Sequence, residues 1–322
     1  MLRLALVHRW TRMLVALVLG VNAGAGWGQN FPAKPVRIVT GEAGGTNDLV
    51  SRLIAQGISS GLGQNVVVEN RPSSVLGDLA SKAPPDGYLL LVAGSTFMLG
   101  PLLQKLPYDP VRDFSAITLV ISQPVVLVVH PSLPVKSARD LIVLAKAHSG
   151  KLNYASTGTG GIFHLAAELL KSMSAVDIVR VPYKGISQAI NDTIAGQVQL
   201  TFVSLGGADP HIKSGRLRVL AISSARPSVL YPGLSTVAAA GLPGYEAVSL
   251  VAAFAPARTP SVLINRLNQE MVRVLSQSEV KEKFLSVGAE TIPGSPEQLA
   301  ATLKSEITKW GKVILDAGIK AE

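Results

Sequence analysis

Residues 36–48 (VRIVTGEAGGTND) join a short apolar run to a glycine-rich turn and then to the start of an amphipathic helix. A strand, a tight turn and a helix in this order form the first step of an α/β unit. The glycines let the backbone approach a ligand closely, and the first N–H groups of the helix have no partner within it. Together with the helix dipole they make the turn a candidate anion pocket.

The same arrangement recurs in residues 154–165 (YASTGTGGIFHL). Hydroxyl groups of Thr46, Ser156, Thr157 and Thr159 add donors to the two turns. A tight turn between a strand and a helix needs glycine for structural reasons too, so each turn taken singly has a purely structural explanation. We expect one shared anion site because one turn falls in each half of the predicted fold.

The rest of the chain alternates apolar runs with amphipathic helices, which is typical of α/β architecture. Most of these runs are continuously hydrophobic, as in strands covered on both faces. The predicted strands are 36–40, 65–70, 88–94, 117–130, 152–156, 178–182, 198–203, 217–224 and 247–255. The run 117–130 is long enough for one strand or for two. The predicted helices are 47–58, 137–147, 187–195, one that begins at Thr259-Pro260, and one that begins at Ser295-Pro296 and ends at Gly318.

Two long apolar segments, 124–130 and 248–256, are predicted to cross between two lobes. We expect residues 29–124 and 256–322 to form the first lobe, and residues 125–255, crossover strands included, to form the second. A length of 322 residues agrees with two lobes, because it exceeds what a single core serves well.

Residues 1–28 have the pattern of a secretory signal peptide. Arg3, Arg9 and Arg12 are followed by a short apolar run, residues 13–21 (MLVALVLGV), and then by small residues. A membrane anchor is the alternative, but a span takes about 20 residues. The chain contains no cysteine, which argues against a lipid anchor, disulfides and thiol chemistry. We therefore expect export to the periplasm, with the signal peptide cleaved and no lipid anchor.

Charge and motifs argue against several classes of function. The formal net charge of +9 is thinly spread and only 5% of residues are aromatic, which does not fit a nucleic-acid binder, although a positive field would attract anionic solutes. The five histidines have no metal-ligand spacing. The sequence also lacks a G-x-S-x-G elbow, a Walker loop and an S-x-x-K motif followed by K-T-G. We expect no metal, no cofactor and no enzymatic activity.

Eight longer strings occur in a characteristic order. They are 34–39 (KPVRIV), 62–72 (LGQNVVVENRP), 85–88 (PDGY), 106–110 (LPYDP), 151–156 (KLNYAS), 181–185 (VPYKG), 215–218 (GRLR) and 241–245 (GLPGY). In this order the chain resembles the Bug family, the TctC-like solute receptors of tripartite tricarboxylate transporters. The resemblance covers the whole chain after the predicted signal peptide.

The resemblance implies a type II periplasmic-binding-protein-like fold, with two α/β lobes, a double crossover and a ligand cleft between the lobes. It implies a small carboxylate ligand, held largely by backbone N–H groups and waters. It also implies docking to an integral-membrane permease that has a large and a small subunit. We expect the receptor itself to be a monomer.

The resemblance also places the candidate ligand-binding residues in particular loops. They are Gly44, Gly45, Thr46 and Asp48 in the first turn, Ser95 and Thr96 in a polar turn, Ser156, Gly158, Thr159 and Gly160 in the second turn, Tyr183, Lys184 and Gly185 in a third segment, and Val203. Asp48 is expected to hold its helix start rather than to touch an anion. A packed Tyr183 and a solvated Lys184 are the alternative to a pair that donates to the ligand, and His164 is expected to be a packing or helix-surface residue.

Four positions depart from the family pattern at the expected cleft. The first turn carries Glu42 where relatives usually read V-P-F-P-P-G-G, and Ser73 to Leu76 replace a G-A-G-G turn. Val203 stands where an Asp is common, and Leu250 where a Trp is common. Glu42 would oppose an anion unless it points away or pairs with a cationic group of the ligand. The scaffold is therefore expected to be kept and the pocket altered.

The expected function is an extracytoplasmic solute-binding protein that captures a small carboxylate for a tripartite tricarboxylate-type transporter. The alternatives are a receptor that feeds a signalling partner, or a family member with a degenerate pocket. A hydrolase of the same compartment is disfavoured because no pair of nucleophile and base is found.

Overall fold

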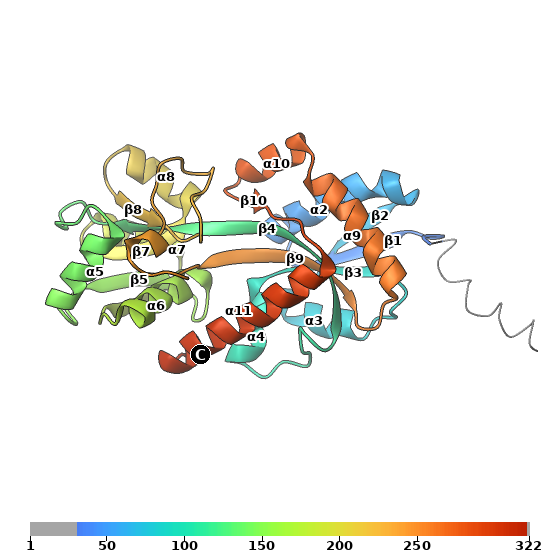
Figure 1. The fold of residues 1–322 in the computed structure, drawn as a ribbon, viewed down its shortest axis with the longest axis horizontal. Helices are drawn as coiled ribbons and strands as arrows, with labels where there is room; N and C mark the ends of the chain where they lie inside the picture. Colours follow the sequence, from blue (N-terminus) through green and yellow to red (C-terminus); the bar gives the residue numbers. More distant parts are fainter. Residues whose placement is uncertain (1–30, 321–322) are drawn as a thin grey trace, which may run out of the picture.

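The computed structural model describes residues 31–320. The predicted signal peptide, residues 1–28, lies outside the described residues. Two α/β lobes are joined by two long strands, β4 (Phe114–Val129) and β9 (Val248–Pro256), which run lengthwise through an elongated molecule (Figure 1). The prediction of two lobes with a double crossover is therefore met by a single pair of antiparallel strands.

The first lobe is built on a sheet with the strand order β2-β1-β3-β9-β4. Its parallel strands are β1 (Val36–Thr40), β2 (Val66–Asn70) and β3 (Leu89–Gly94), and β10 (Glu290–Thr291) pairs antiparallel with β4. The helices of this lobe are α2 (Thr46–Leu62), α3 (Ser73–Ser81), α4 (Ser95–Leu103), α9 (Ser261–Leu275) and α10 (Ser278–Leu285).

The second lobe is built on a sheet in which β4 pairs with β7 (Leu200–Ser204) and β8 (Arg218–Ile222). Beyond β7 lie the parallel strands β5 (Asn153–Thr157) and β6 (Val179–Tyr183). The helices are α5 (Ala138–Ala147), α6 (Ile162–Ser174), α7 (Ile186–Ile194) and α8 (Leu205–Lys213), with a short 3-10 turn, η1 (Ala238–Ala240).

Strand β4 changes sheets at one peptide bond. Pro124 is paired with Val248 in the first sheet, and Val125 is paired with Ser204 in the second. Strand β9 pairs along its length with β4 and β3 of the first sheet. The predicted second lobe included this strand, whereas backbone pairing places it with the first. The exact boundaries of the lobes remain our proposal.

The last helix, α11 (Pro296–Asp316), connects the two lobes on one side of the crossover (Figure 1). It packs on α4 and α9 of the first lobe, on β4, and on α6 of the second lobe. Trp310 is the largest side chain that it buries, at 1% exposed. A continuous apolar cluster runs from Phe97 through Trp310 to Leu165, so the two lobes share a core on this side.

Local sequence explains where several helices begin and end. The Ser295 hydroxyl accepts from the amide of Gln298, and the Gln298 side chain accepts from the Ser295 amide, so the two residues form a capping box. Ser137 caps α5 by accepting from the Asp140 amide. Helix α2 extends past the predicted end at residue 58 and stops at Gly63, whose φ of +69° suits glycine.

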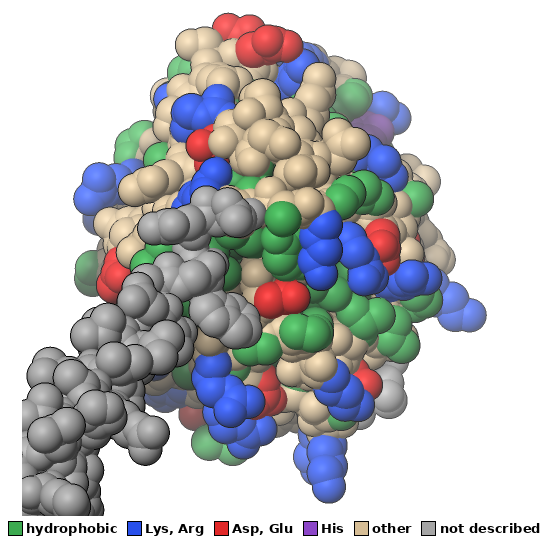
Figure 2. Space-filling view, turned by 90° about the vertical axis from the view of Figure 1, so that its right-hand side faces the viewer, with side chains coloured by type: hydrophobic (Ala, Val, Ile, Leu, Met, Phe, Trp, Pro, Cys, Tyr) green, Lys and Arg blue, Asp and Glu red, His purple; other side chains and the backbone are tan. Residues whose placement is uncertain are grey.

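Within residues 31–320 no helix is long and apolar enough to cross a membrane. Figure 2 shows the end of the molecule formed by the first lobe, where Lys and Arg side chains are scattered among acidic and apolar ones.

Candidate functional site

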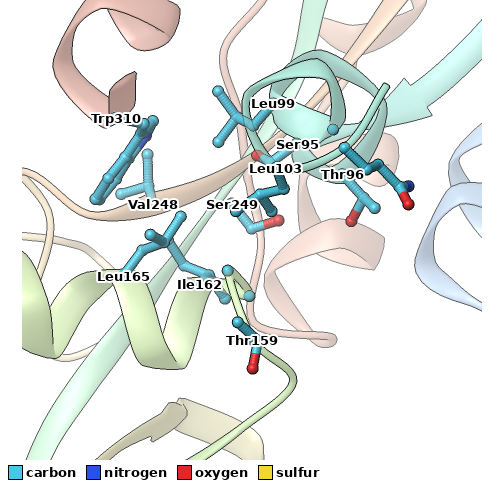
Figure 3. Close-up of a pocket in the computed structure, with 14 residues that line it drawn as sticks. Ser95, Thr96, Leu99, Leu103, Thr159, Ile162, Leu165, Val248, Ser249 and Trp310 are labelled. Atoms are coloured by element: carbon cyan, nitrogen blue, oxygen red, sulfur yellow. The ribbon is translucent and has the colours of Figure 1, made fainter. Parts of the chain in front are cut away.

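A cavity of about 370 Å³ lies between α4 of the first lobe and the start of α6 of the second (Figure 3). Strand β9 and helix α11 complete its wall. The lining residues are Ser95, Thr96, Leu99, Gly100, Leu103, Gln104, Thr159, Gly160, Gly161, Ile162, Leu165, Val248, Ser249 and Trp310. The volume falls in the range of small-molecule sites, roughly 300–1,000 Å³.

Two helices from different lobes begin at this cavity. The residue before α4 is Gly94 and the residue before α6 is Gly161, and neither helix start receives a hydrogen bond from a capping side chain. Glycine cannot supply such a cap because it has no side chain, so the first-turn N–H groups are left for water or a ligand. The positive ends of both helix dipoles therefore favour an anion here.

The two ends of the cavity differ in chemistry. Ser95, Thr96, Ser249 and Thr159 contribute hydroxyl groups to the lining and Gln104 contributes an amide, and Thr96 and Thr159 lie on the side away from Trp310 (Figure 3). Trp310, Val248 and Leu165 gather on the other side, with Leu99, Leu103 and Ile162 along the walls. None of the lining side chains carries a charge. The arrangement suits a solute with one polar end and one apolar part.

Ser95 also joins the first lobe to the crossover. Its hydroxyl accepts from the amide of Leu250 in β9 at 2.9 Å. Leu250 occupies a position predicted to lie at the cleft, but its side chain is buried in the shared core at 5% exposed. The contact of this position with the site is therefore made by its backbone.

The first glycine turn is held by Asp48. The Gly44 amide donates to one carboxylate oxygen of Asp48 at 2.9 Å, and the Asn70 side chain donates to the other at 2.9 Å. Arg52 lies 3.0 Å from the same carboxylate. The Gly44 hydrogen bond, followed by Asn70 and Arg52, lowers the pKa of Asp48. Asp48 therefore holds the first glycine turn at the start of α2, as expected. The Gly44 amide is used in this hydrogen bond within the protein.

Glu42 points to the start of α3. Its carboxylate accepts from the Ser73 amide at 2.9 Å and from the Ser73 hydroxyl at 2.8 Å. These bonds, the amide first, lower the pKa of Glu42. Two of the four departures from the family pattern, Glu42 and the segment that begins at Ser73, therefore meet in one contact.

The second glycine turn has a cation behind it. Ser156 is fully buried and its hydroxyl accepts from the Arg180 guanidinium at 2.9 Å. Two more nitrogens of Arg180 lie 3.3 Å from the Thr159 hydroxyl. Among residues 31–320 no carboxylate lies within ion-pair distance of Arg180. Arg180 does not line this cavity, so it acts on an anion beside Thr159 through its electrostatic field.

His164 supports the same turn from the first turn of α6. Its Nδ1 accepts from the Gly160 amide at 3.1 Å, and the side chain is buried. Glu168, one turn further, accepts from the Tyr154 hydroxyl at 2.5 Å and pairs with Lys171 at 2.8 Å. Burial, followed by the bond to Glu168, raises the pKa of Tyr154. The expected packing role of His164 fits this position.

The third predicted segment lies outside the cavity. The Tyr183 hydroxyl donates to Asp192 at 2.8 Å, and burial followed by this bond raises the pKa of Tyr183 to about 12. Lys184 is exposed and Gly185 precedes α7. Within this conformation Tyr183 therefore serves the packing of its own lobe.

Four of the predicted ligand-binding residues line the cavity, namely Ser95, Thr96, Thr159 and Gly160. The others lie beside it or elsewhere, and Val203 is fully buried between β4 and α8 residues in the second lobe. An apolar side chain in the interior of a sheet cannot reach a solute there. Its assignment as a ligand-binding residue therefore has no support in this structure.

The residues missed by sequence reasoning are the apolar wall and Arg180. Nothing in the local pattern separates Leu99 or Leu165 from ordinary core residues, because a pocket wall and a core face share one periodicity. Arg180 had a signal: it is a lone cation in the apolar run directly before residues 181–185 (VPYKG).

The second cavity and the acidic and histidine side chains give less support for a binding site. A second cavity of about 430 Å³ lies between α8 and α10 and is lined by none of the predicted residues. Among the described residues no cluster of three His, Asp or Glu side chains could hold a metal ion.

Comparison with known proteins identifies the family. The family model "Tripartite tricarboxylate transporter family receptor" (TctC) matches residues 50–319. The chain belongs to this family. It is 34% identical over 319 residues to a Pseudomonas sp. strain P51 protein called "UPF0065 protein in tcbD-tcbE intergenic region", covering 96% of this chain and 95% of the relative. It is 33% identical to Protein BugT of Bordetella pertussis, covering 90% and 91%.

A solved structure agrees with the TctC assignment. R. palustris Rpa4515 with adipate is 34% identical, with a TM-score of 0.71, and the match covers 91% of this chain and all of that one. The predicted fold class and the resemblance to the Bug and TctC receptors are thereby confirmed. The family is one of solute-binding receptors and not of enzymes.

Proposed function

We propose that this TctC-family receptor captures a small carboxylate in the periplasm and presents it to a tripartite permease with a large and a small subunit. The observation that carries the proposal is the cavity at which two uncapped helices, α4 and α6, begin from opposite lobes. A carboxylate oxygen is a suitable acceptor for first-turn N–H groups.

Charge supports the same ligand class. The hydroxyl groups of Ser95, Thr96 and Thr159 add donors at the polar end of the cavity. Arg180 places a guanidinium behind Thr159 that no described carboxylate neutralises. The positive field of Arg180 favours an anion over a neutral solute in the neighbouring cavity. The adipate of Rpa4515 belongs to the same chemical class.

Thermal unfolding with a panel of carboxylates tests the proposal. Binding to the folded state alone adds about 2.7 kcal/mol of stability when the ligand is at one hundred times its Kd. The panel spans mono-, di- and tricarboxylates, and each acid is matched by its neutral amide. We expect at least one acid to raise the melting temperature while its amide does not. A panel without any shift, or equal shifts for acid and amide, would contradict the proposal.

A further inference from the structure

The part of the cavity next to Trp310 has no cation that could hold a second carboxylate. Its walls are Leu99, Leu103, Leu165, Val248 and Trp310, and the neutral side chains of Ser249 and Gln104 complete the lining. The single N–H of the Trp310 ring already donates to Glu306 at 2.7 Å. An ionised carboxylate placed there would lose its water and gain at most a neutral donor such as Ser249, with no cation in return.

The first lobe also carries a carboxylate of its own, Glu42, in the first glycine turn. Glu42 occupies the start of α3, where both hydrogen bonds to Ser73 are already made. The start of α3 is therefore not open to a solute anion. Glu42 does not line the cavity, so the lining residues carry the inference.

We infer that the preferred solute is a monocarboxylate with an apolar body, its carboxylate at the starts of α4 and α6 and its hydrocarbon part against Trp310. This inference rests on the proposed function and narrows its ligand class. The cavity of about 370 Å³ accommodates an aliphatic chain or a single ring. Affinity is then set by buried hydrocarbon on one side and by a single charge on the other.

Titration calorimetry with hexanoate and adipate tests the inference directly. Both acids have six carbons, and they differ in whether the far end is a methyl group or a carboxylate. We expect hexanoate to bind at least tenfold more tightly. Along the series butyrate, pentanoate and hexanoate, each added methylene should tighten binding about fourfold if it is fully buried.

A pair of variants in α4 places the selectivity in the cavity. Leu103 lines the cavity, whereas Leu102 is its neighbour in the same helix, is also half-buried, and lies outside the lining. Leu103→Lys puts a cation at the apolar wall, so we expect weaker hexanoate binding and at least tenfold relative gain for adipate. Leu102→Lys should leave the ratio of the two affinities unchanged.

The outcomes separate the inference from the proposed function. Tighter binding of adipate than of hexanoate, or no dependence on chain length, overturns the inference and leaves a carboxylate receptor. Absence of binding by every carboxylate overturns both. If Leu103→Lys does not fold, the two acids and the chain-length series with the unaltered protein still decide.

Discussion

Replacing Gly160 by alanine tests how closely the lobes approach at the cavity. Gly160 has a φ of +75°, and a Cβ at this position would lie 2.3 Å from Cδ1 of Leu103 in the other lobe. The left-handed backbone costs a residue with a Cβ about 1–2 kcal/mol. Pushing the Leu103 side chain off its rotamer adds about 0.5–1.5 kcal/mol.

Gly158 supplies a matched control in the same turn. Its φ of +56° imposes a similar backbone cost, but no atom lies within 4 Å of a Cβ built there. We therefore expect Gly158→Ala to lower the free energy of unfolding by about 1–2 kcal/mol. Gly160→Ala should lower it by about 1.5–3.5 kcal/mol, since it carries the contact cost as well.

Urea unfolding at 25 °C measures both changes, and a double-mutant cycle isolates the contact. Leu103→Ala removes the atom that clashes, so in its presence the two glycine substitutions should cost the same. Equal costs for Gly158→Ala and Gly160→Ala with Leu103 present would refute the close approach of the lobes. A difference that survives Leu103→Ala would refute the contact as its cause.

Substitutions at three further positions, with one control, probe the site. Arg180→Gln should weaken carboxylate binding about tenfold in calorimetry, because the carboxylate loses a positive charge nearby. Arg218→Gln is the control and should not weaken it, because among the described residues the Arg218 side chain donates to backbone carbonyls of its own lobe. Glu42→Ala should strengthen the binding of dianions, and unchanged affinity would show that its charge does not reach the ligand. The hydrogen bonds to Ser73 lower the pKa of Glu42. The stability that Glu42 contributes is therefore present above its unfolded pKa and is lost as the pH falls through its folded pKa. In Glu42→Gln the melting temperature should fall less steeply over this acidic pH range. Ser95→Ala should cost about 1–3 kcal/mol of unfolding free energy because a backbone amide of β9 loses its acceptor, and a smaller loss would mean that water replaces the hydroxyl.

Most strands were predictable because they are largely apolar runs, whereas the two-residue strand β10 has no such signal. The predicted strand 36–40 is β1 with the same bounds, and the start and capping of α11 at Ser295 follow from a local motif. The predicted strand 117–130 is a single strand that begins three residues earlier and serves both sheets. Local composition could not show this, because the change of sheet at residue 124 depends on partners far away in the chain.

Four helices were missed for physical reasons. Helix α4 is apolar on almost every face and contains Pro101, so it has no amphipathic period to detect. Helix α8 contains two glycines and Pro210, which lower its propensity. Helices α3 and α10 have only nine and eight residues. Tertiary packing stabilises such helices and the local sequence does not.

The site was predicted in part, because glycine turns have a recognisable local sequence pattern and the apolar walls of a cavity do not. The second turn and Ser95 reach the cavity as expected. The first turn is instead closed by Asp48, and Glu42 turns to Ser73, a partner that only the fold brings near. Trp310 lies 151 residues beyond Thr159, so no short-range pattern could join them.

The central claim is that backbone amides of both lobes hold one carboxylate, and amide NMR of ¹⁵N-labelled protein tests it most directly. During a titration with hexanoate, the amide resonances of Thr96 in α4 and of Ile162 and Phe163 in α6 should shift together with one Kd. The same titration with hexanamide should leave them in place. Shifts confined to one lobe, or equal shifts with the amide, would contradict the claim.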